Sequence, residues 1–243
     1  MIGTLRNRAG ERLDNVFTPG RTGDPTLVVV SHGVTSHHDR PYLTALCDAL
    51  GARGIASLRF SFAGNGASEG SFAAATIGKE VEDLGAVLDA CGDRPVAFVG
   101  HSMGAAVGVL RAAQDPRLRA LVSLAGMVDV QGFCERHFRG LVPGRDEMFG
   151  RPGCVLSPAF VADAARIGTV LAVAESITVP WLLVHGDQDE LVPLAEAEAA
   201  HAANSRAALS VLAGVDHRFT GAIDRLIAVV APWLARTLGL PPR

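Results

Sequence analysis

The sequence predicts an α/β fold in which a mostly parallel central sheet is covered by helices on both faces. Short apolar runs rich in Val, Leu and Ile alternate with longer segments of helical periodicity along the 243 residues. These short runs are strongly apolar, which is typical of strands buried on both sides of a parallel sheet. Hydrophobic residues make up 49% of the chain and charged residues 19%, which provides a large core and excludes a disordered chain. We therefore expect one domain over residues 1–243.

Six segments are predicted to be strands, because each is short, apolar and bounded by Gly, Pro, Asp or Arg. They are residues 26–31, 55–60, 95–100, 120–124, 181–185 and 208–212. Weaker apolar positions at Leu5 and Val16 flank the turn-like residues 8–11 and predict an antiparallel hairpin at one edge of the sheet.

Helical periodicity predicts the helices that connect these strands. They are residues 41–53, 76–91, 103–114, 195–203 and 219–238. In the second helix, positions 77, 81, 84 and 88 form an apolar face for packing. Three acidic residues of that helix are expected to point toward water: Glu80, Glu82 and Asp83.

Residues 127–178 interrupt the alternation of strands and helices. Large apolar side chains are spread there among Gly and Pro, at Phe133, Phe138, Met148, Phe149 and Phe160. A segment of this kind in a compact α/β domain is usually a lid or a binding element, so we predict a cap inserted into the domain. A plain excursion with two short helices is the alternative.

Charge and hydropathy exclude several classes of partner. The chain has 22 basic and 25 acidic residues, a net charge of −3, and no cluster of basic residues, so we expect no nucleic acid partner. Its longest apolar runs fall far short of the ~20 residues that span a bilayer, so we expect no membrane span. The N-terminal arginines are not followed by an apolar stretch, so we expect no secretory signal and a cytoplasmic location.

Cysteine and histidine spacing does not indicate a cofactor or a metal site. Cys47, Cys91, Cys134 and Cys154 lack CxxC spacing, and a chain of this size does not need disulfides, so we expect unpaired thiols. No HExxH motif or comparable cluster is present. We expect neither a metal nor another cofactor.

The sharpest local signal is Gly100-His101-Ser102-Met103-Gly104, which follows a predicted strand and opens a predicted helix. Glycines on either side of the serine relieve crowding in a tight strand-to-helix turn, and such a turn exposes the serine hydroxyl. Ser102 is therefore the predicted nucleophile.

A serine hydroxyl needs a general base, and the base needs a third group to orient it. Of the eight histidines, His217 lies between the last strand and the last helix, where this architecture collects reactive groups. We predict that His217 is the base.

Asp189 is the predicted orienting carboxylate. It follows the strand at 181–185, and the order Ser102, Asp189, His217 matches one known triad arrangement. Asp187 is the main alternative, Asp129 is a weaker one, and Asp216 lies too near His217 in the chain to reach around its ring.

Two backbone N–H groups are expected to stabilise the oxyanion of a tetrahedral intermediate. One is the N–H of Met103, directly after the nucleophile, and the other is that of Val34, which follows His32-Gly33 in the loop after the first long strand.

Together these residues resemble the serine esterase branch of the α/β-hydrolase superfamily. The resemblance rests on five segments in the same order: residues 32–34, 59–70, 100–104, 185–193 and 216–219. Within that branch the chain is similar to small bacterial cinnamoyl or feruloyl esterases, to monoacylglycerol lipases and to serine aminopeptidase-like hydrolases. The resemblance implies an α/β-hydrolase fold, a triad of Ser102, Asp189 and His217, and a small cap at about 127–178. Its G-x-x-D-x-x-V pattern, here residues 186–192, favours Asp189 over Asp187.

We therefore expect a serine hydrolase that cleaves small-molecule carboxylic esters with small to medium acyl groups through an acyl-enzyme. The same machinery would also serve a peptidase or a thioesterase. A ligand-binding protein that keeps the hydrolase scaffold without turnover is the second hypothesis. A homodimer is compatible with the sequence.

Overall fold

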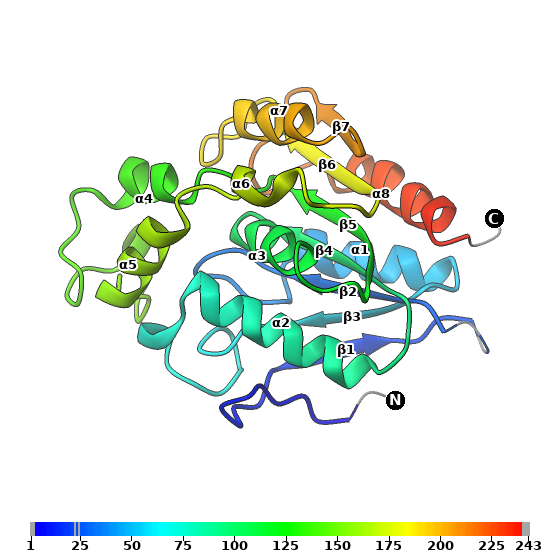
Figure 1. Ribbon diagram of the computed structural model, residues 1–243, viewed down its shortest axis with the longest axis horizontal. Helices are drawn as coiled ribbons and strands as arrows, with labels where there is room; N and C mark the ends of the chain where they lie inside the picture. The colour runs from blue at the N-terminus through cyan, green and yellow to red at the C-terminus, as the bar shows by residue number, and fades with distance from the viewer. Residues whose placement is uncertain (1–2, 22, 24, 240–243) are drawn as a thin grey trace.

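Seven strands form one open, mostly parallel sheet at the centre of the computed structural model, which describes residues 3–21, 23 and 25–239 (Figure 1). The strands are β1 (Asn15–Thr18), β2 (Leu27–Ser31), β3 (Ala56–Phe60), β4 (Val96–His101), β5 (Leu118–Leu124), β6 (Trp181–Gly186) and β7 (Ala207–Leu212). Their order is β1-β3-β2-β4-β5-β6-β7, and only β1 runs antiparallel to its neighbour. The predicted fold class is confirmed, and each of the six predicted strands lies within two residues of an observed one.

The N-terminal hairpin differs from the prediction. Leu5 pairs with Leu13, whose N–H donates to the Leu5 carbonyl at 2.9 Å, and Val16 instead pairs with Arg59 of β3. The turn is tight, because the N–H of Asn7 donates to the Glu11 carbonyl at 3.0 Å. Leu5 is therefore paired with Leu13, which lies three residues before Val16 in the chain. Val16 instead belongs to β1, the antiparallel edge strand of the main sheet.

The predicted connecting helices are α1 (Pro41–Ala52), α2 (Ile77–Cys91), α3 (Met103–Ala112), α7 (Leu194–Ala203) and α8 (Ile223–Thr237), with a single 3-10 turn, η1 (Phe72–Ala74), before α2. The last helix begins four residues later than predicted, because Phe219 has a left-handed φ of 56° within a turn.

The sheet separates two apolar clusters. One lies under α2 and α3 and includes Leu84 and Val107, whereas the other lies under α1 and α8 and includes Leu46 and Val230. Helices therefore cover both faces of the sheet, as predicted (Figure 1).

The prediction that three acidic residues of α2 face water is wrong for two of them. Glu82 is exposed, but Glu80 and Asp83 are each 1% exposed. The chain packs over this side of α2, since Asn7 Nδ2 and the Ala63 N–H each donate to the Asp83 carboxylate at 2.8 Å. Periodicity within one helix cannot report this cover, because it comes from segments distant in sequence.

Residues 127–178 form α4 (Val130–Phe138), a 3-10 turn, η2 (Met148–Gly150), α5 (Pro158–Ile167) and the short α6 (Leu171–Ala174). An isolated bridge between Asp129 and Thr169 brings the two ends of the excursion together. Figure 1 shows α4 and α5 projecting beyond the carboxyl ends of the parallel strands. That edge of the sheet is where loops of this architecture form binding sites.

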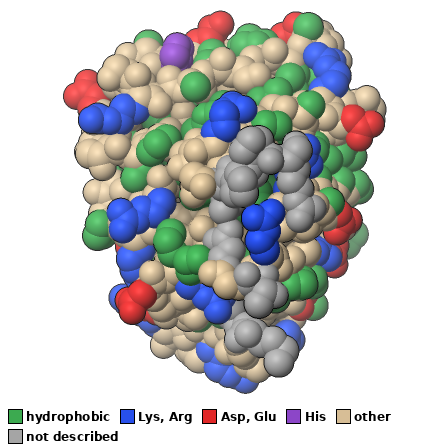
Figure 2. Space-filling model, turned by 90° about the vertical axis from the view of Figure 1, so that its right-hand side faces the viewer, with side chains coloured by type: hydrophobic (Ala, Val, Ile, Leu, Met, Phe, Trp, Pro, Cys, Tyr) green, Lys and Arg blue, Asp and Glu red, His purple; other side chains and the backbone are tan. Residues whose placement is uncertain are grey.

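The opposite end of the molecule has a mixed surface. Figure 2 shows Arg and Lys side chains dispersed there among acidic, apolar and other residues.

All four cysteines are free. Within the described ranges, no helix combines the length and the apolar character needed to cross a bilayer.

Candidate active site

Ser102 lies on the turn between β4 and α3, at the carboxyl end of the sheet. Its φ of 53° and ψ of −118° place a non-glycine residue in a strained region of backbone space. The turn requires glycine at position 100, because a Cβ there would lie 2.3 Å from the Gly104 carbonyl oxygen. Ser102 is only 3% exposed and lines a cavity. The strained turn therefore presents its side chain to that cavity rather than to bulk water.

Asp189 and His217 are joined by a hydrogen bond. His217 Nδ1 lies 2.8 Å from Asp189 Oδ2, and the Asp189 side chain is completely buried. The other carboxylate oxygen, Oδ1, accepts hydrogen bonds from the N–H groups of Leu191 at 2.9 Å and Val192 at 2.8 Å. The loop after β6 therefore holds the carboxylate firmly against the His217 ring.

The alternative carboxylates lie elsewhere. Asp187 accepts from the Gly214 N–H at 2.6 Å and is exposed. Asp129 accepts from the Gly132 N–H at 2.9 Å and caps the start of α4. Asp216 accepts from the N–H groups of its own turn, including that of Thr220 at 2.8 Å. Of the four candidates, the structure brings only Asp189 to the His217 ring.

A second histidine, His185, also contacts Asp189. Its Nε2 lies 3.2 Å from Asp189 Oδ2 and 2.8 Å from the Val192 carbonyl oxygen, so one ring proton faces two acceptors. Burial raises the pKa of Asp189, but hydrogen bonds from His185 and His217 outweigh it and hold that pKa well below its usual value. Asp189 is therefore ionised and can stabilise a protonated His217.

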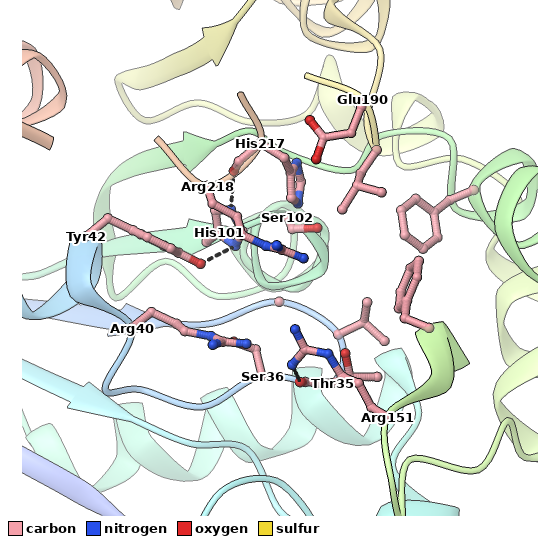
Figure 3. Close-up of a pocket in the computed structure, with 15 residues that line it drawn as sticks. Thr35, Ser36, Arg40, Tyr42, His101, Ser102, Arg151, Glu190, His217 and Arg218 are labelled. Carbon is pink, nitrogen blue, oxygen red and sulfur yellow. Dashed lines mark hydrogen bonds between the residues drawn. The ribbon is translucent and has the colours of Figure 1, made fainter. Parts of the chain in front are cut away.

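Ser102 and His217 line the same cavity, and Figure 3 shows them next to each other. Among the residues that the structure describes, no hydrogen bond joins the Ser102 hydroxyl to the His217 ring. Such bonds are often long in the absence of substrate and shorten in the complex.

The loop after β2 lies directly against Ser102. A Cβ on Gly33 would come within 2.8 Å of Ser102 Cβ, so only glycine allows this approach. The next residue, Val34, and Met103 both line or adjoin the cavity, and neither backbone N–H donates a hydrogen bond to another described residue. Two unpaired amides thus flank Ser102 on the two predicted segments.

Histidines that the sequence did not single out hold these loops in place. His32 Nε2 accepts from the Phe62 N–H at 3.1 Å, and burial lowers the pKa of His32 to about 3, so its proton is on Nδ1, which donates to the Gly33 carbonyl. His101 Nε2 donates to the His217 carbonyl at 2.9 Å, while its Nδ1 accepts from the Tyr42 hydroxyl. Burial and the neighbouring His217 lower the pKa of His101 well below its usual value. Both rings are therefore neutral supports.

Comparison with known proteins identifies similar sequences and folds. A family model described as "Serine aminopeptidase, S33" matches residues 24–143. The mitochondrial palmitoyl-protein thioesterase ABHD10 of mouse is 29% identical over 202 residues, which cover 78% of this chain and 64% of the relative. The rat protein is 28% identical over 154 residues, covering 58% of this chain and 50% of the relative. The chain thus spans between half and two thirds of these curated relatives.

Solved structures share the fold over nearly the whole chain. Est1E from Butyrivibrio proteoclasticus with ferulic acid bound has a TM-score of 0.87 and 24% identity, covering 98% of this chain and 100% of its own. Mouse ABHD10 has a TM-score of 0.77 and 22% identity, covering 97% and 99%. The chain therefore has the α/β-hydrolase fold.

The cavity beside Ser102 has a volume of about 100 Å³. This volume is smaller than the roughly 300–1,000 Å³ of pockets that enclose drug-sized ligands. Its lining combines apolar side chains with charged ones. Val34, Phe133, Phe149 and Leu191 are apolar, whereas Arg40, Arg151, Arg218 and Glu190 are charged. Two of the apolar side chains and one arginine come from the 127–178 segment.

No group of three or more His, Cys, Asp or Glu side chains is placed to hold a metal ion within the described part of the chain.

Proposed function

We propose that this protein is a serine hydrolase that cleaves carboxylic esters of small to medium acyl groups. One arrangement carries the proposal: Ser102 on a strained turn faces the same cavity as His217, which is hydrogen-bonded to the buried Asp189. A hydroxyl nucleophile, a base and an orienting carboxylate are the groups that acyl transfer needs.

The reaction proceeds in two steps. In the first, Ser102 Oγ attacks the ester carbonyl carbon while His217 Nε2 takes the hydroxyl proton, and Asp189 stabilises the resulting imidazolium. The N–H groups of Val34 and Met103 bind the oxyanion. His217 then donates the proton to the departing alcohol, which leaves an acyl-enzyme. In the second step, water loses its proton to His217 and attacks the acyl carbon, and Ser102 is released with its proton restored.

The 127–178 segment acts in this proposal as a cap within a single domain of residues 1–243. Phe133 and Phe149 reach from it to the cavity, and Arg151 Nη1 donates to the Thr35 carbonyl at 2.6 Å, which ties the segment to the loop beside Ser102. The small cavity favours short acyl groups.

A thioesterase is the second candidate, because the curated relatives are named palmitoyl-protein thioesterases. The same nucleophile and amides would serve both reactions. A palmitoyl chain would require the cavity to open beyond its present volume. The cytoplasmic location and the homodimer remain predictions, and the relatives carry the word mitochondrial in their name.

The test compares 4-nitrophenyl butanoate with the butanoyl thioester of N-acetylcysteamine at pH 7.5. We expect turnover of the ester and a loss of at least about a thousandfold in kcat in Ser102→Ala. Ser176→Ala, which changes an exposed serine, is the control. Equal turnover in wild type and Ser102→Ala would contradict the proposal. Tight ligand binding without hydrolysis would favour the non-catalytic hypothesis, and faster cleavage of the thioester would favour the second candidate.

A further inference from the structure

Three arginines surround the cavity that contains Ser102. Arg40 lies directly before α1, Arg151 directly follows η2, and Arg218 follows His217. Figure 3 shows their guanidinium groups directed toward one region beside Ser102. The fold therefore gathers three cations from three distant segments at one site.

None of these arginines forms a close ion pair with a described residue, although the charge of Arg218 acts on the nearby Asp216. Within the described residues, no carboxylate oxygen lies within 4.0 Å of the guanidinium nitrogens of Arg40, Arg151 or Arg218. By contrast, Arg111 and Arg117 both pair with Asp115 at 2.7 Å elsewhere on the molecule. The one acidic residue in the cavity lining, Glu190, forms no ion pair with any of the three.

Most of the donors on these arginines are unused. Arg40 Nε donates to Ser36 Oγ at 2.7 Å, and Arg151 Nη1 donates to the Thr35 carbonyl at 2.6 Å. The Arg218 guanidinium makes no hydrogen bond to another described residue. Each guanidinium has five N–H donors in a fixed plane, so donors remain free on all three.

The like charges act on one another. Burial and the nearby charges of Arg151 and Arg218 lower the pKa of Arg40 below its usual value. Arg40 and Arg151 are half-buried, whereas Arg218 is exposed. Repulsion among the three cations is unfavourable, and it is least screened at the two half-buried ones, unless an anion is bound between them. An anionic ligand would remove that cost and accept the unused hydrogen bonds.

We propose that Arg40, Arg151 and Arg218 form a subsite for an anionic group of the substrate, so that the enzyme prefers esters carrying a carboxylate or a phosphate. This inference rests on the proposed hydrolase function. The planar guanidinium fork binds both kinds of anion through paired hydrogen bonds. The apolar lining at Val34, Phe133, Phe149 and Leu191 takes the uncharged part of the same substrate.

The test uses matched pairs of charged and neutral esters. For a charge on the alcohol, 4-(butanoyloxy)benzoate is compared with its methyl ester, and 4-(butanoyloxy)phenyl phosphate with its dimethyl ester. For a charge on the acyl group, mono-4-nitrophenyl adipate is compared with its methyl ester. Each kcat/KM is divided by the rate constant of the same ester with hydroxide, which removes differences in intrinsic reactivity.

We expect at least one charged ester to be preferred over its neutral partner by about tenfold, since hydrogen bonds to charged groups are strong. The pair that shows the preference identifies the anion and its side of the scissile bond. Arg40→Gln and Arg218→Gln should reduce this ratio about tenfold. Arg8→Gln, at an exposed arginine in the N-terminal turn, should leave activity on every ester unchanged. Both esters of a pair are assayed with the same protein sample, so any fraction of misfolded, inactive protein cancels in the ratio.

The proposal is overturned if no pair shows a preference, or if Arg40→Gln and Arg218→Gln both keep it. If wild type hydrolyses none of the esters, the proposed function fails instead, and the subsite is tested by calorimetry. 4-Hydroxybenzoate should then bind more tightly than methyl 4-hydroxybenzoate, and Arg218→Gln should weaken its binding about tenfold. Equal binding of the two compounds would overturn the subsite independently of activity.

Discussion

Asp189 has four polar neighbours although its side chain is fully buried. Two backbone N–H groups bind one carboxylate oxygen, and the rings of His185 and His217 approach the other at 3.2 and 2.8 Å. Because its pKa lies below the ordinary value near 3.9, the stabilisation it provides is present above about pH 4 and is lost as the pH falls further. Protonation of Asp189 is therefore not expected to limit activity above pH 5.

Replacing Asp189 with Asn should reduce kcat by about 10⁴-fold, because an amide cannot hold the His217 ring in the required tautomer. The matched control is Asp187→Asn on the same loop, where the amide oxygen can still accept from the Gly214 N–H. That variant should stay within a few-fold of wild type on 4-nitrophenyl butanoate. The opposite ranking would assign the orienting role to Asp187.

At this scale the sequence predicts some groups of the site and misses others. Ser102 stands out because its glycines and its strand-to-helix setting form a local pattern, and the structure places Asp189 and His217 against each other. His101 and His185 belong to the same strands as the motifs but have no pattern of their own. The approach of Arg40, Arg151 and Arg218 depends on tertiary folding, which no local spacing reports.

Among the secondary-structure elements, the turn between β4 and α3 depends most on close backbone contact. A Cβ at position 104 would lie 2.3 Å from the His32 carbonyl oxygen. We expect Gly104→Ala to destabilise the protein by about 1–3 kcal/mol and to move the Gly33–Val34 loop away from Ser102. Activity should fall by more than tenfold in protein that remains folded, as measured by urea unfolding and ester hydrolysis.

The control for this variant is Gly140→Ala, since a Cβ there meets no atom within 4 Å. Gly140→Ala should change neither the free energy of unfolding nor the rate of ester hydrolysis appreciably. If Gly104→Ala kept full activity, the Gly33–Val34 loop would not need its present approach to Ser102.

The buried acidic side of α2 leads to a pH-dependent prediction. Glu80 has no hydrogen-bond partner for either carboxylate oxygen among the described residues, and burial together with the nearby Asp83 raises its pKa well above the usual value. Folded protein therefore retains a proton that the unfolded chain releases near pH 4.3, so stability falls as the pH rises above that value.

Glu80→Gln should remove this loss of stability. The increase in the free energy of unfolding that it causes should be at least about 1 kcal/mol larger at pH 8 than at pH 5. Urea unfolding at the two pH values measures the difference. Glu82→Gln on the exposed side of the same helix is the control and should show little change. A gain from Glu80→Gln that is the same at both pH values would contradict the raised pKa.

Helices and strands can be predicted from the sequence where buried positions recur regularly along the element. The apolar strands β2, β4 and β6 were predictable because helices cover both of their faces and every residue in them is buried. The edge strand β1 and the buried acids of α2 were not, since each is defined by the segment that packs against it. Val16 needs β3 as a partner, and Asp83 needs Asn7.

At the scale of the whole molecule, the central sheet separates the two apolar clusters. Ile77 lies in one cluster and Ile55 in the other, at 0% and 2% exposure. Each Ile→Val change should lower the free energy of unfolding by about 0.5–1.5 kcal/mol. Because the two sites share no contacts, the double variant should equal the sum within about 0.5 kcal/mol in urea unfolding. A larger deviation would show that packing strain passes through the sheet.

The carboxyl edge of this sheet is where the whole molecule converges on one site. Loops after β2, β4, β6 and β7 and the 127–178 segment all reach the cavity, which is the position expected for a ligand in a sheet of this topology. Fold class and the general place of the site are therefore predictable from the order of strands and motifs, whereas the charge of the cavity is a property of the assembled chain.

The most direct measurement of the central claim is covalent labelling by a fluorophosphonate, followed by mass spectrometry of the intact and digested protein. Wild type should gain one adduct, located on Ser102, within minutes at pH 7.5. Ser102→Ala should gain none, and Asp189→Asn should be labelled far more slowly. An adduct on another residue, or equal labelling of Ser102→Ala, would contradict the assignment of Ser102 as the activated nucleophile.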